Sequence, residues 1–177
     1  MQVEYVILVT KNDMPLGTME KMEAHEKGVL HRAFSVFLFN SKMEMLLQKR
    51  AAGKYHSPNL WTNTVCSHPR AGEETIDAAN RRLMDEMGMK TELKELFSFL
   101  YKADVGQGLK ENEYDHVFVG ITDSLPVINT DEVGEYKYMN LDDLKNDVLI
   151  HPENYTVWFK IALKELFKYN SKIKELL

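Results

Sequence analysis

The chain has 177 residues and a formal net charge of −5, from 22 basic and 27 acidic side chains. Its content of 44% hydrophobic and 28% charged residues excludes general disorder and fibrous repeats. A net acidic chain is a poor candidate for sequence-independent nucleic-acid binding, which requires many phosphates to be neutralised. The length predicts a single domain over residues 1–177.

Cysteine content and hydropathy suggest where the chain works. A single cysteine cannot form an internal disulfide, which fits a reducing compartment. The first residues lack the basic and apolar regions of a signal peptide, and no stretch approaches the ~18 apolar residues of a membrane span. We therefore expect a cytoplasmic protein that does not enter a membrane, and the sequence leaves its oligomeric state open.

In chain order, the residue pattern predicts strands and helices that are mixed rather than strictly alternating. The predicted strands cover residues 3–10, 15–21, 33–39, 45–50, 93–101, 114–122 and 135–139. The predicted helices cover 23–30, 74–87, 140–149 and 152–177. Strands 33–39 and 45–50 should form a hairpin, and residues 51–70 a long loop. This order predicts an α+β fold with a mixed β-sheet between helices.

The clearest predicted helix is 74–87. Its apolar residues recur at helical spacing, and Gly88 follows where a left-handed cap belongs. These apolar residues are Ile76, Ala79, Leu83 and Met87.

The only cysteine, Cys66, lies in the predicted loop, two residues before His68. An isolated cysteine is most often a buried structural thiol. A thiol in a polar segment beside a histidine can instead supply a proton or act as a nucleophile. The residues alone leave both interpretations open.

A second group of candidates consists of three histidines and two glutamates. His25 and His31 flank a glycine, and His68 comes much later, so their spacing alone is weak evidence for a metal site. Glu111 and Glu113 would point to the same face of an extended segment, where they repel unless solvent or a cation separates them. A solvated strand end is the alternative. Together the five side chains would suit Mn²⁺, with Zn²⁺ possible.

A third group consists of cations, most of which are expected on a solvated surface. They are Lys21, Arg50, Lys54, Arg70, Arg81 and Arg82. Arg50 and Lys54 lead into the segment that carries the cysteine, and Arg82 stands one helical turn before Glu86.

Residues 67–89 resemble a degenerate Nudix box. Glu73, Arg81, Leu83, Glu86, Gly88 and Met89 stand in register with that motif. Ser67 replaces a glycine, whereas Arg82 and Asp85 replace glutamates. Nudix hydrolases hold Mg²⁺ against a diphosphate through such carboxylates. An arginine in place of a metal ligand repels Mg²⁺ and attracts phosphate, so the altered box favours diphosphate binding without hydrolysis.

This box, the segment 61–69 and the Glu111-Asn112-Glu113 motif occur together in the order typical of type I isopentenyl-diphosphate Δ-isomerases. The chain resembles that family from its first residues to Trp158. It departs in Pro58-Asn59, where a glycine is common, and in the His25–His31 gap, which can vary in the family. The resemblance implies a Nudix-like fold and an isomerase that moves the double bond of a five-carbon diphosphate.

The resemblance also implies a role for each matching residue. The metal would be held by His25, His31, His68, Glu111 and Glu113. Cys66 and Glu113 would handle protons on opposite faces of the alkene, and Tyr101 would support the glutamate. The diphosphate would contact Lys21, Arg50, Lys54 and Arg82. Glu86 and the Cys66 carbonyl would hold Mg²⁺ with the substrate, and Trp158 would lie beside the isoprenoid tail.

Two rival interpretations remain at this point. A Nudix pyrophosphohydrolase acting on a nucleotide would share the fold, but Arg82 argues against it. A non-enzymatic Nudix-like ligand sensor or scaffold would not need Cys66, Glu111 and Glu113, which the chain retains. The sequence does not decide whether Cys66 or Glu113 delivers the first proton.

Overall fold

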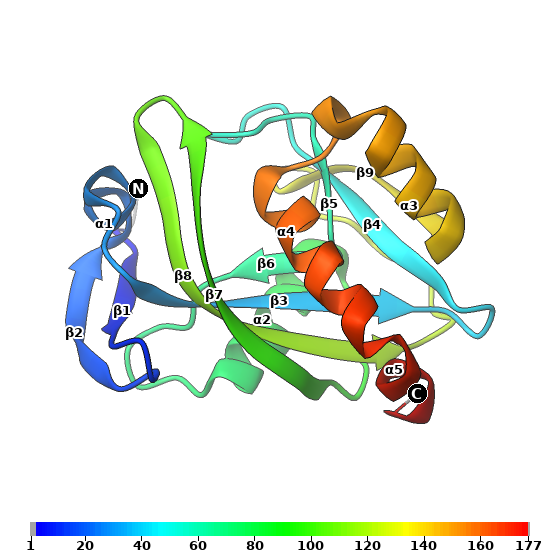
Figure 1. Cartoon of the computed structure of the whole chain (residues 1–177), viewed down its shortest axis with the longest axis horizontal. Helices are drawn as coiled ribbons and strands as arrows, with labels where there is room; N and C mark the ends of the chain where they lie inside the picture. The colour runs from blue at the N-terminus through cyan, green and yellow to red at the C-terminus, as the bar shows by residue number, and fades with distance from the viewer. Residues whose placement is uncertain (1–2, 177) are drawn as a thin grey trace.

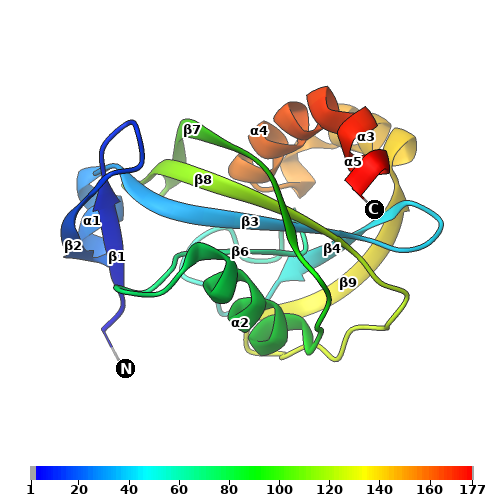
Figure 2. The same ribbon diagram turned by 90° about the horizontal axis from the view of Figure 1, so that it is seen from below.

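A computed structural model describes residues 3–176 and shows a nine-stranded sheet with helices on both faces (Figures 1 and 2). The strands are β1 (Tyr5–Val9), β2 (Pro15–Glu20), β3 (His31–Phe39), β4 (Glu44–Arg50), β5 (Trp61–Thr62), β6 (Val65–Ser67), β7 (Lys94–Gly106), β8 (Leu109–Ile121) and β9 (Val133–Asn140). The helices are α1 (Lys21–Lys27), α2 (Thr75–Met87), α3 (Leu141–Ile150), α4 (Val157–Leu166) and α5 (Asn170–Leu176), with 3₁₀ turns at Pro152–Asn154 and Phe167–Tyr169. The predicted α+β class and mixed sheet are confirmed.

Strand β3 organises the sheet. It runs parallel to β8 from the pair His31 and Glu113 to the pair Phe39 and Ile121, and it also pairs antiparallel with β1 and β6. The parallel register therefore places two candidate metal ligands on neighbouring strands at the same level.

The predicted hairpin of 33–39 and 45–50 is correct only next to its turn. Strands β3 and β4 pair at Phe39 and Met45 and then separate. Strand β6 takes the adjoining stretch of β3, from Phe34 to Val36, while β4 pairs along its length with β9. The backbone hydrogen-bonding groups of β3 and β4 are thus paired mainly with other strands rather than with each other.

The sheet separates two hydrophobic cores (Figure 2). Phe34, Val36 and Leu38 of β3 point towards α2, whereas the alternate residues Phe37 and Phe39 point towards α4 and α5. The sequence of a strand that is covered on both faces is a continuous apolar run, because neither set of side chains contacts water.

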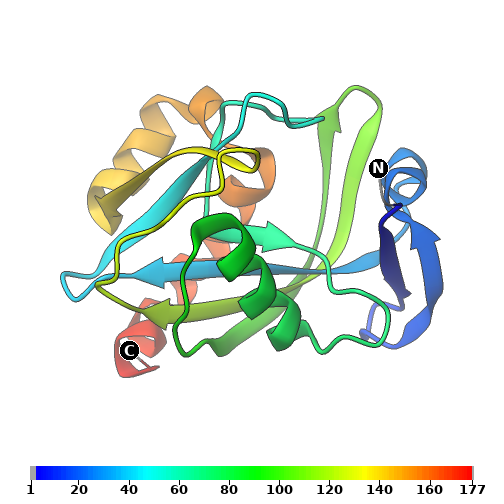
Figure 3. The same ribbon diagram turned by 180° about the vertical axis from the view of Figure 1, so that it is seen from behind.

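Helix α2 agrees with its prediction and lies across β3 and β6, in front of them in the view of Figure 3. Ala79, Leu83 and Met87 are buried, and Ile76 packs partly buried against the same core. The backbone N–H of Gly88 donates to the last helical carbonyls at φ 61°. A Cβ at this position would lie 2.6 Å from the carbonyl oxygen of Val127, so both the space and the left-handed backbone favour glycine.

The long helix predicted within 152–177 is present but is divided into two helices. A 3₁₀ turn comes first, and α4 begins after Thr156, whose hydroxyl accepts a hydrogen bond from the N–H of Phe159. The Thr156 N–H donates to the carbonyl of Trp61 at 3.0 Å, which holds this residue outside a helix. A second 3₁₀ turn separates α4 from α5. By contrast, Asn140 caps α3 as predicted, accepting from the N–H of Asp142.

The predicted loop 51–70 contains two short strands, and Cys66 lies on β6 rather than in a loop. Buried polar side chains form this segment. The Asn63 amide donates to the carbonyls of Val36 and Val65, and the Thr64 hydroxyl donates to the carbonyl of Leu46 at 2.7 Å. Hydrogen bonds of buried polar side chains hold this segment in place, so its strands lack the apolar pattern from which strands are predicted.

Strand β8 begins earlier than predicted, so Glu111 and Glu113 lie within it rather than at its entrance. No helix in the described residues is long and apolar enough to cross a membrane.

Candidate active site

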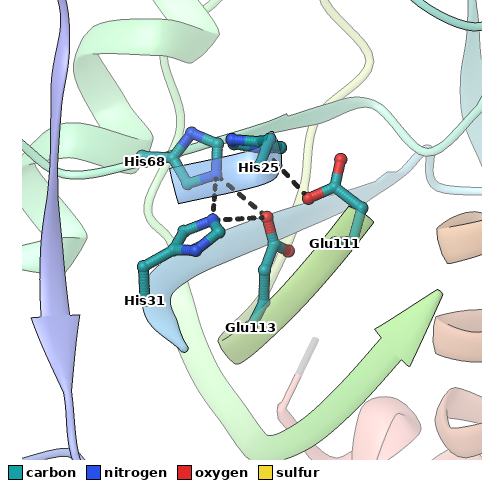
Figure 4. Close-up of side chains that lie close together, drawn as sticks. All are labelled: His25, His31, His68, Glu111 and Glu113. Carbon is teal, nitrogen blue, oxygen red and sulfur yellow. Dashed lines mark hydrogen bonds and ion pairs between the residues drawn. The ribbon is translucent and has the colours of Figure 1, made fainter. Parts of the chain in front are cut away.

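Five side chains converge between α1, β3, β6 and β8 (Figure 4). One donor atom from each of His25, His31, His68, Glu111 and Glu113 lies within 4.8 Å of all the others. His68 Nε2 is 2.9 Å from Glu113 Oε1 and 3.2 Å from His31 Nε2. His25 Nε2 is 3.2 Å from Glu111 Oε2.

The backbone orients two of the imidazoles. The Nδ1–H of His25 donates to the carbonyl of Lys21 at 2.6 Å, and that of His31 donates to the carbonyl of Val29 at 2.8 Å. The left-handed Gly28, at φ 62°, ends α1 between these two histidines. With Nδ1 held by a carbonyl, each Nε2 is turned towards the centre of the cluster, which is the usual orientation of metal-binding histidines.

The cluster fits a divalent cation. Glu111 and Glu113 are 5% and 6% exposed, so the alternative of a solvated strand end is wrong. His25 Nε2 and Glu111 Oε2 are buried and have no hydrogen-bond partner within residues 3–176. Two buried carboxylates this close together are unfavourable without positive charge, and a metal ion bound by them and by the three imidazoles would supply it. The predicted metal-binding residues therefore lie where they can bind a divalent ion.

Glu113 has a second partner in Tyr101, whose hydroxyl donates to Glu113 Oε2 at 2.5 Å. Burial opposes ionisation of Glu113, but hydrogen bonding with His31 and Tyr101 outweighs burial and lowers its pKa to about 2. Burial and the neighbouring Glu113 raise the pKa of Tyr101 well above its ordinary value. Glu113 is thus an ionised carboxylate that accepts a hydrogen bond, and Tyr101 is the neutral phenol that donates it.

Cys66 is partly exposed and lines the same cavity as Glu113 and Tyr101. Surrounding protein atoms raise the pKa of its thiol to about 12, because burial outweighs the attraction of Arg50. The thiol therefore carries its proton at neutral pH, within the cavity that the metal cluster also borders.

The same cavity also collects positive charge. Its lining contains four of the six candidate cations, namely Lys21, Arg50, Lys54 and Arg82. Arg81 instead forms a two-pronged ion pair with Glu73, at 2.7 and 2.8 Å, within the altered Nudix box. Arg70 is exposed outside the cavity.

Carboxylates within reach already neutralise three of the cavity cations. Lys21 Nζ lies 2.8 Å from Glu4, and Lys54 Nζ lies 2.5 Å from Glu132. Arg82 Nη2 lies 2.7 Å from Glu86.

Arg50 differs from the other three cavity cations. Its Nη2 donates to the carbonyl of His56 at 3.1 Å, and its guanidinium lies 5.1 Å from the Trp158 ring centroid. Its Nε is buried without a hydrogen-bond partner in the described chain. A buried donor without a partner is ready to bind an anion.

Sequence reasoning missed several residues of the cavity, of which His56 and Glu132 are the most informative. His56 is buried edge-on to Trp158, with ring centroids 5.3 Å apart, and its Nε2 is 3.7 Å from Glu111. Burial and the charge of Arg50 lower its pKa to about 3, so the ring is neutral. Neither residue belongs to a motif. The only signal that could have identified His56 is its position two residues after Lys54.

Comparison with known structures supports the fold. The chain superimposes on a crystal structure from Deinococcus radiodurans with a TM-score of 0.76, covering 92% of this chain and 98% of that one at 17% identity. The MutT protein from Methanosarcina mazei Go1 gives a TM-score of 0.66 over 80% of this chain and 95% of that one, at 15% identity. The NUDIX domain family matches residues 29–159, so the fold and the sequence define a Nudix protein.

Comparison with curated sequences is more specific. A protein from Pectobacterium atrosepticum named isopentenyl-diphosphate Delta-isomerase is 47% identical over 96% of this chain and 94% of its own length. One from Photorhabdus laumondii, named isopentenyl-diphosphate Delta-isomerase 2, is 53% identical over 92% of each chain. The chain belongs to the isopentenyl-diphosphate Delta-isomerase family, as its motifs had indicated.

Proposed function

We propose that this chain interconverts isopentenyl diphosphate and dimethylallyl diphosphate in isoprenoid biosynthesis, with residues 1–177 acting as one domain. The relatives named above support the reaction. The observation that carries the proposal is a single cavity lined by Cys66 and Glu113 together with four cations.

The reaction adds a proton to one terminal carbon of an unactivated alkene and removes one from the other side of the resulting tertiary cation. It therefore needs a proton donor and a proton acceptor that contact the substrate. Cys66 and Glu113 take these roles in our proposal. Their resting states, a protonated thiol and an ionised carboxylate, supply one proton and one acceptor between them. Tyr101 holds Glu113 in place through its hydroxyl.

Trp158 is suited to the carbocation intermediate. Its ring is 5% exposed and lines the cavity, with neutral His56 against it. An aromatic face stabilises a desolvated cation by about 2 kcal/mol, and an apolar wall excludes the water that would trap it. A neutral imidazole beside the cation adds no repulsive charge.

In our proposal the chain binds two metal ions. His25, His31, His68, Glu111 and Glu113 would hold Mn²⁺ or Zn²⁺, and Glu86 with the Cys66 carbonyl would hold Mg²⁺ beside the diphosphate. The first ion, when bound, supplies positive charge that tunes the proton affinity of the Glu113 carboxylate.

Lys21, Arg50, Lys54 and Arg82 bind the diphosphate in this proposal. Arg82 stands where a Nudix hydrolase carries a metal-binding glutamate, and its guanidinium can form paired hydrogen bonds with phosphate oxygens. The substitution favours holding the diphosphate intact over cleaving it.

The test is incubation of the purified metal-loaded protein with isopentenyl diphosphate and Mg²⁺, followed by proton and phosphorus NMR. We expect dimethylallyl diphosphate to accumulate to equilibrium without release of phosphate. Phosphate release without isomerisation would support the hydrolase instead, and an unchanged substrate would contradict the proposal.

A further inference from the structure

Glu132 has no role in the reaction described above, yet its carboxylate lines the same cavity as the diphosphate-binding cations. Its Oε2 lies 2.5 Å from Lys54 Nζ and 3.4 Å from Arg82 Nη2. One carboxylate oxygen thus contacts two cations that come from separate parts of the chain, the segment after β4 and the helix α2. A phosphate oxygen of a bound diphosphate would contact both cations in the same way.

The backbone fixes Glu132 just before β9. Its N–H donates to the carbonyl of Asn129 at 3.0 Å, and its carbonyl accepts from the N–H of Ala51, also at 3.0 Å. Any rearrangement at this position is therefore confined to the side chain. The carboxylate is partly exposed towards the cavity, so it can rotate away without breaking the fold.

The ion pairs also explain why these cations are tolerated in the free protein. Burial of Arg82 is offset by attraction to Glu86 and then to Glu132, which together raise its pKa. Burial likewise opposes ionisation of Glu132, but hydrogen bonding and attraction to Lys54 lower its pKa. Arg82 and Glu132 are therefore both charged at neutral pH, and their ion pair stabilises both charges in the absence of substrate.

We propose that Glu132 is an internal competitor of the diphosphate, occupying Lys54 and Arg82 in the free protein and releasing them when the substrate binds. This inference rests on the proposed function, because it assumes that Lys54 and Arg82 contact the diphosphate. Arg50, which has no carboxylate partner in the described chain, then makes the first contact. Glu132 sets the diphosphate affinity below the value that the cations alone would give.

Glu132 lowers the affinity for diphosphate in two ways, both of which come from its negative charge. In the free protein the Lys54 ammonium already donates to Glu132, so a phosphate oxygen must replace or share this contact. The displaced carboxylate then remains near the diphosphate and repels it. Both effects lower the affinity, and Glu132→Gln removes both while keeping the shape of the side chain.

The test is calorimetric titration of inorganic diphosphate into the metal-loaded protein, in buffer without Mg²⁺ or chelator, so that Glu86 stays paired with Arg82. We expect Glu132→Gln to bind diphosphate at least fivefold more tightly than the unmodified chain. The matched control is Glu135→Gln, because Glu135 also pairs with a lysine, at 3.4 Å from Lys49, but on the exposed face of β9 and outside the cavity. This control should leave the affinity unchanged.

A double-mutant cycle with Lys54→Gln separates competition from a purely structural role. If Glu132 competes through Lys54, the gain from Glu132→Gln should fall to about half or less in the Lys54→Gln background. Equal or weaker diphosphate binding by Glu132→Gln would overturn the inference, and so would a gain that Lys54→Gln leaves intact. Failure of the unmodified chain to bind diphosphate at all would instead count against the proposed function.

Discussion

Two groups of side chains at the cavity, the metal cluster and the cavity cations, are built differently. The metal cluster takes its side chains from α1, β3, β8 and the residue that follows β6, and the paired strands β3 and β8 set the level of His31 and Glu113. The cavity cations are lysine and arginine side chains from the start of α1, the end of β4, the following loop and α2.

The two groups also differ in charge balance. In the described residues, His25 Nε2 and Glu111 Oε2 of the metal cluster face each other at 3.2 Å and have no hydrogen-bond partner, whereas Lys21, Lys54 and Arg82 are paired with carboxylates. An added cation would balance the metal cluster, while three of the four cavity cations are paired before a ligand arrives. Changes to the metal cluster should therefore abolish function, and changes to the cavity cations should reduce it only in part.

The largest expected effect is at the proton-handling pair. Cys66→Ala and Glu113→Gln should each reduce turnover at least about a hundredfold, because neither half of a two-sided proton transfer can replace the other. Turnover should be measured with the isomerase assay, and circular dichroism should show the fold intact. Activity within a fewfold of the unmodified chain in either variant would contradict these roles.

Loss of bound metal is the next effect. The ion should survive gel filtration in the unmodified chain, and His31→Ala should lose most of it, as measured by elemental analysis. His116→Ala is the control, because His116 pairs with Asp13 and Glu95 away from the cluster. Equal metal content in all three proteins, or no metal in a fully active enzyme, would exclude the five-residue site.

A smaller effect, on KM rather than on turnover, is expected when one of the cavity cations is removed. Arg82→Ala should raise KM for isopentenyl diphosphate roughly tenfold, since a charge-assisted hydrogen bond contributes about 1.5–3 kcal/mol and 1.4 kcal/mol is about tenfold in affinity. Arg70→Ala should leave KM unchanged, because Arg70 lies outside the cavity.

A reversed charge at the same position sharpens this test. Arg82→Glu places a negative charge beside the diphosphate and should lose isomerase activity without gaining efficient hydrolysis. Unchanged isomerase kinetics in both Arg82 variants would show that the altered Nudix box has no part in diphosphate binding.

The smallest effect is expected outside the cavity, at the ion pair of Glu73 and Arg81. Glu73→Gln should lower the free energy of unfolding by about 0.5–1 kcal/mol at neutral pH. The hydrogen bond from Arg81 lowers the pKa of Glu73 below 4.5, so its contribution is complete above pH 4.5 and is lost as the pH falls through the folded-state pKa. Urea unfolding of both proteins should show their stabilities converging in acid. A difference that stays constant with pH would contradict this account.

Much of the fold follows from local pattern. The apolar spacing of α2, its glycine cap at Gly88 and the Asn140 cap of α3 depend on neighbours in sequence, and the sequence predicts them. The short strands around Cys66 do not follow, because their order comes from the buried side chains of Asn63 and Thr64 bonding to distant carbonyls. Likewise, the start of α4 after Thr156, rather than at Pro152, depends on a bond between Thr156 and Trp61.

The site residues also divide into those that the sequence predicts and those that it does not. Residues in motifs, such as Glu111, Glu113 and Cys66, could be predicted through family resemblance, although their spacing alone said little. Glu132 could not, because its importance comes from Lys54 and Arg82, which lie far from it in sequence and meet it only in the folded chain.

The central claim is a two-sided proton transfer through Cys66 and Glu113, and isomerisation in deuterated water tests it most directly. The account predicts that dimethylallyl diphosphate forms with solvent deuterium on its new methyl group, because the exchangeable donor protonates the terminal carbon. Mass spectrometry and proton NMR of product taken at early conversion would measure this. Product formed at the normal rate without deuterium would show an internal hydrogen shift and would contradict the account.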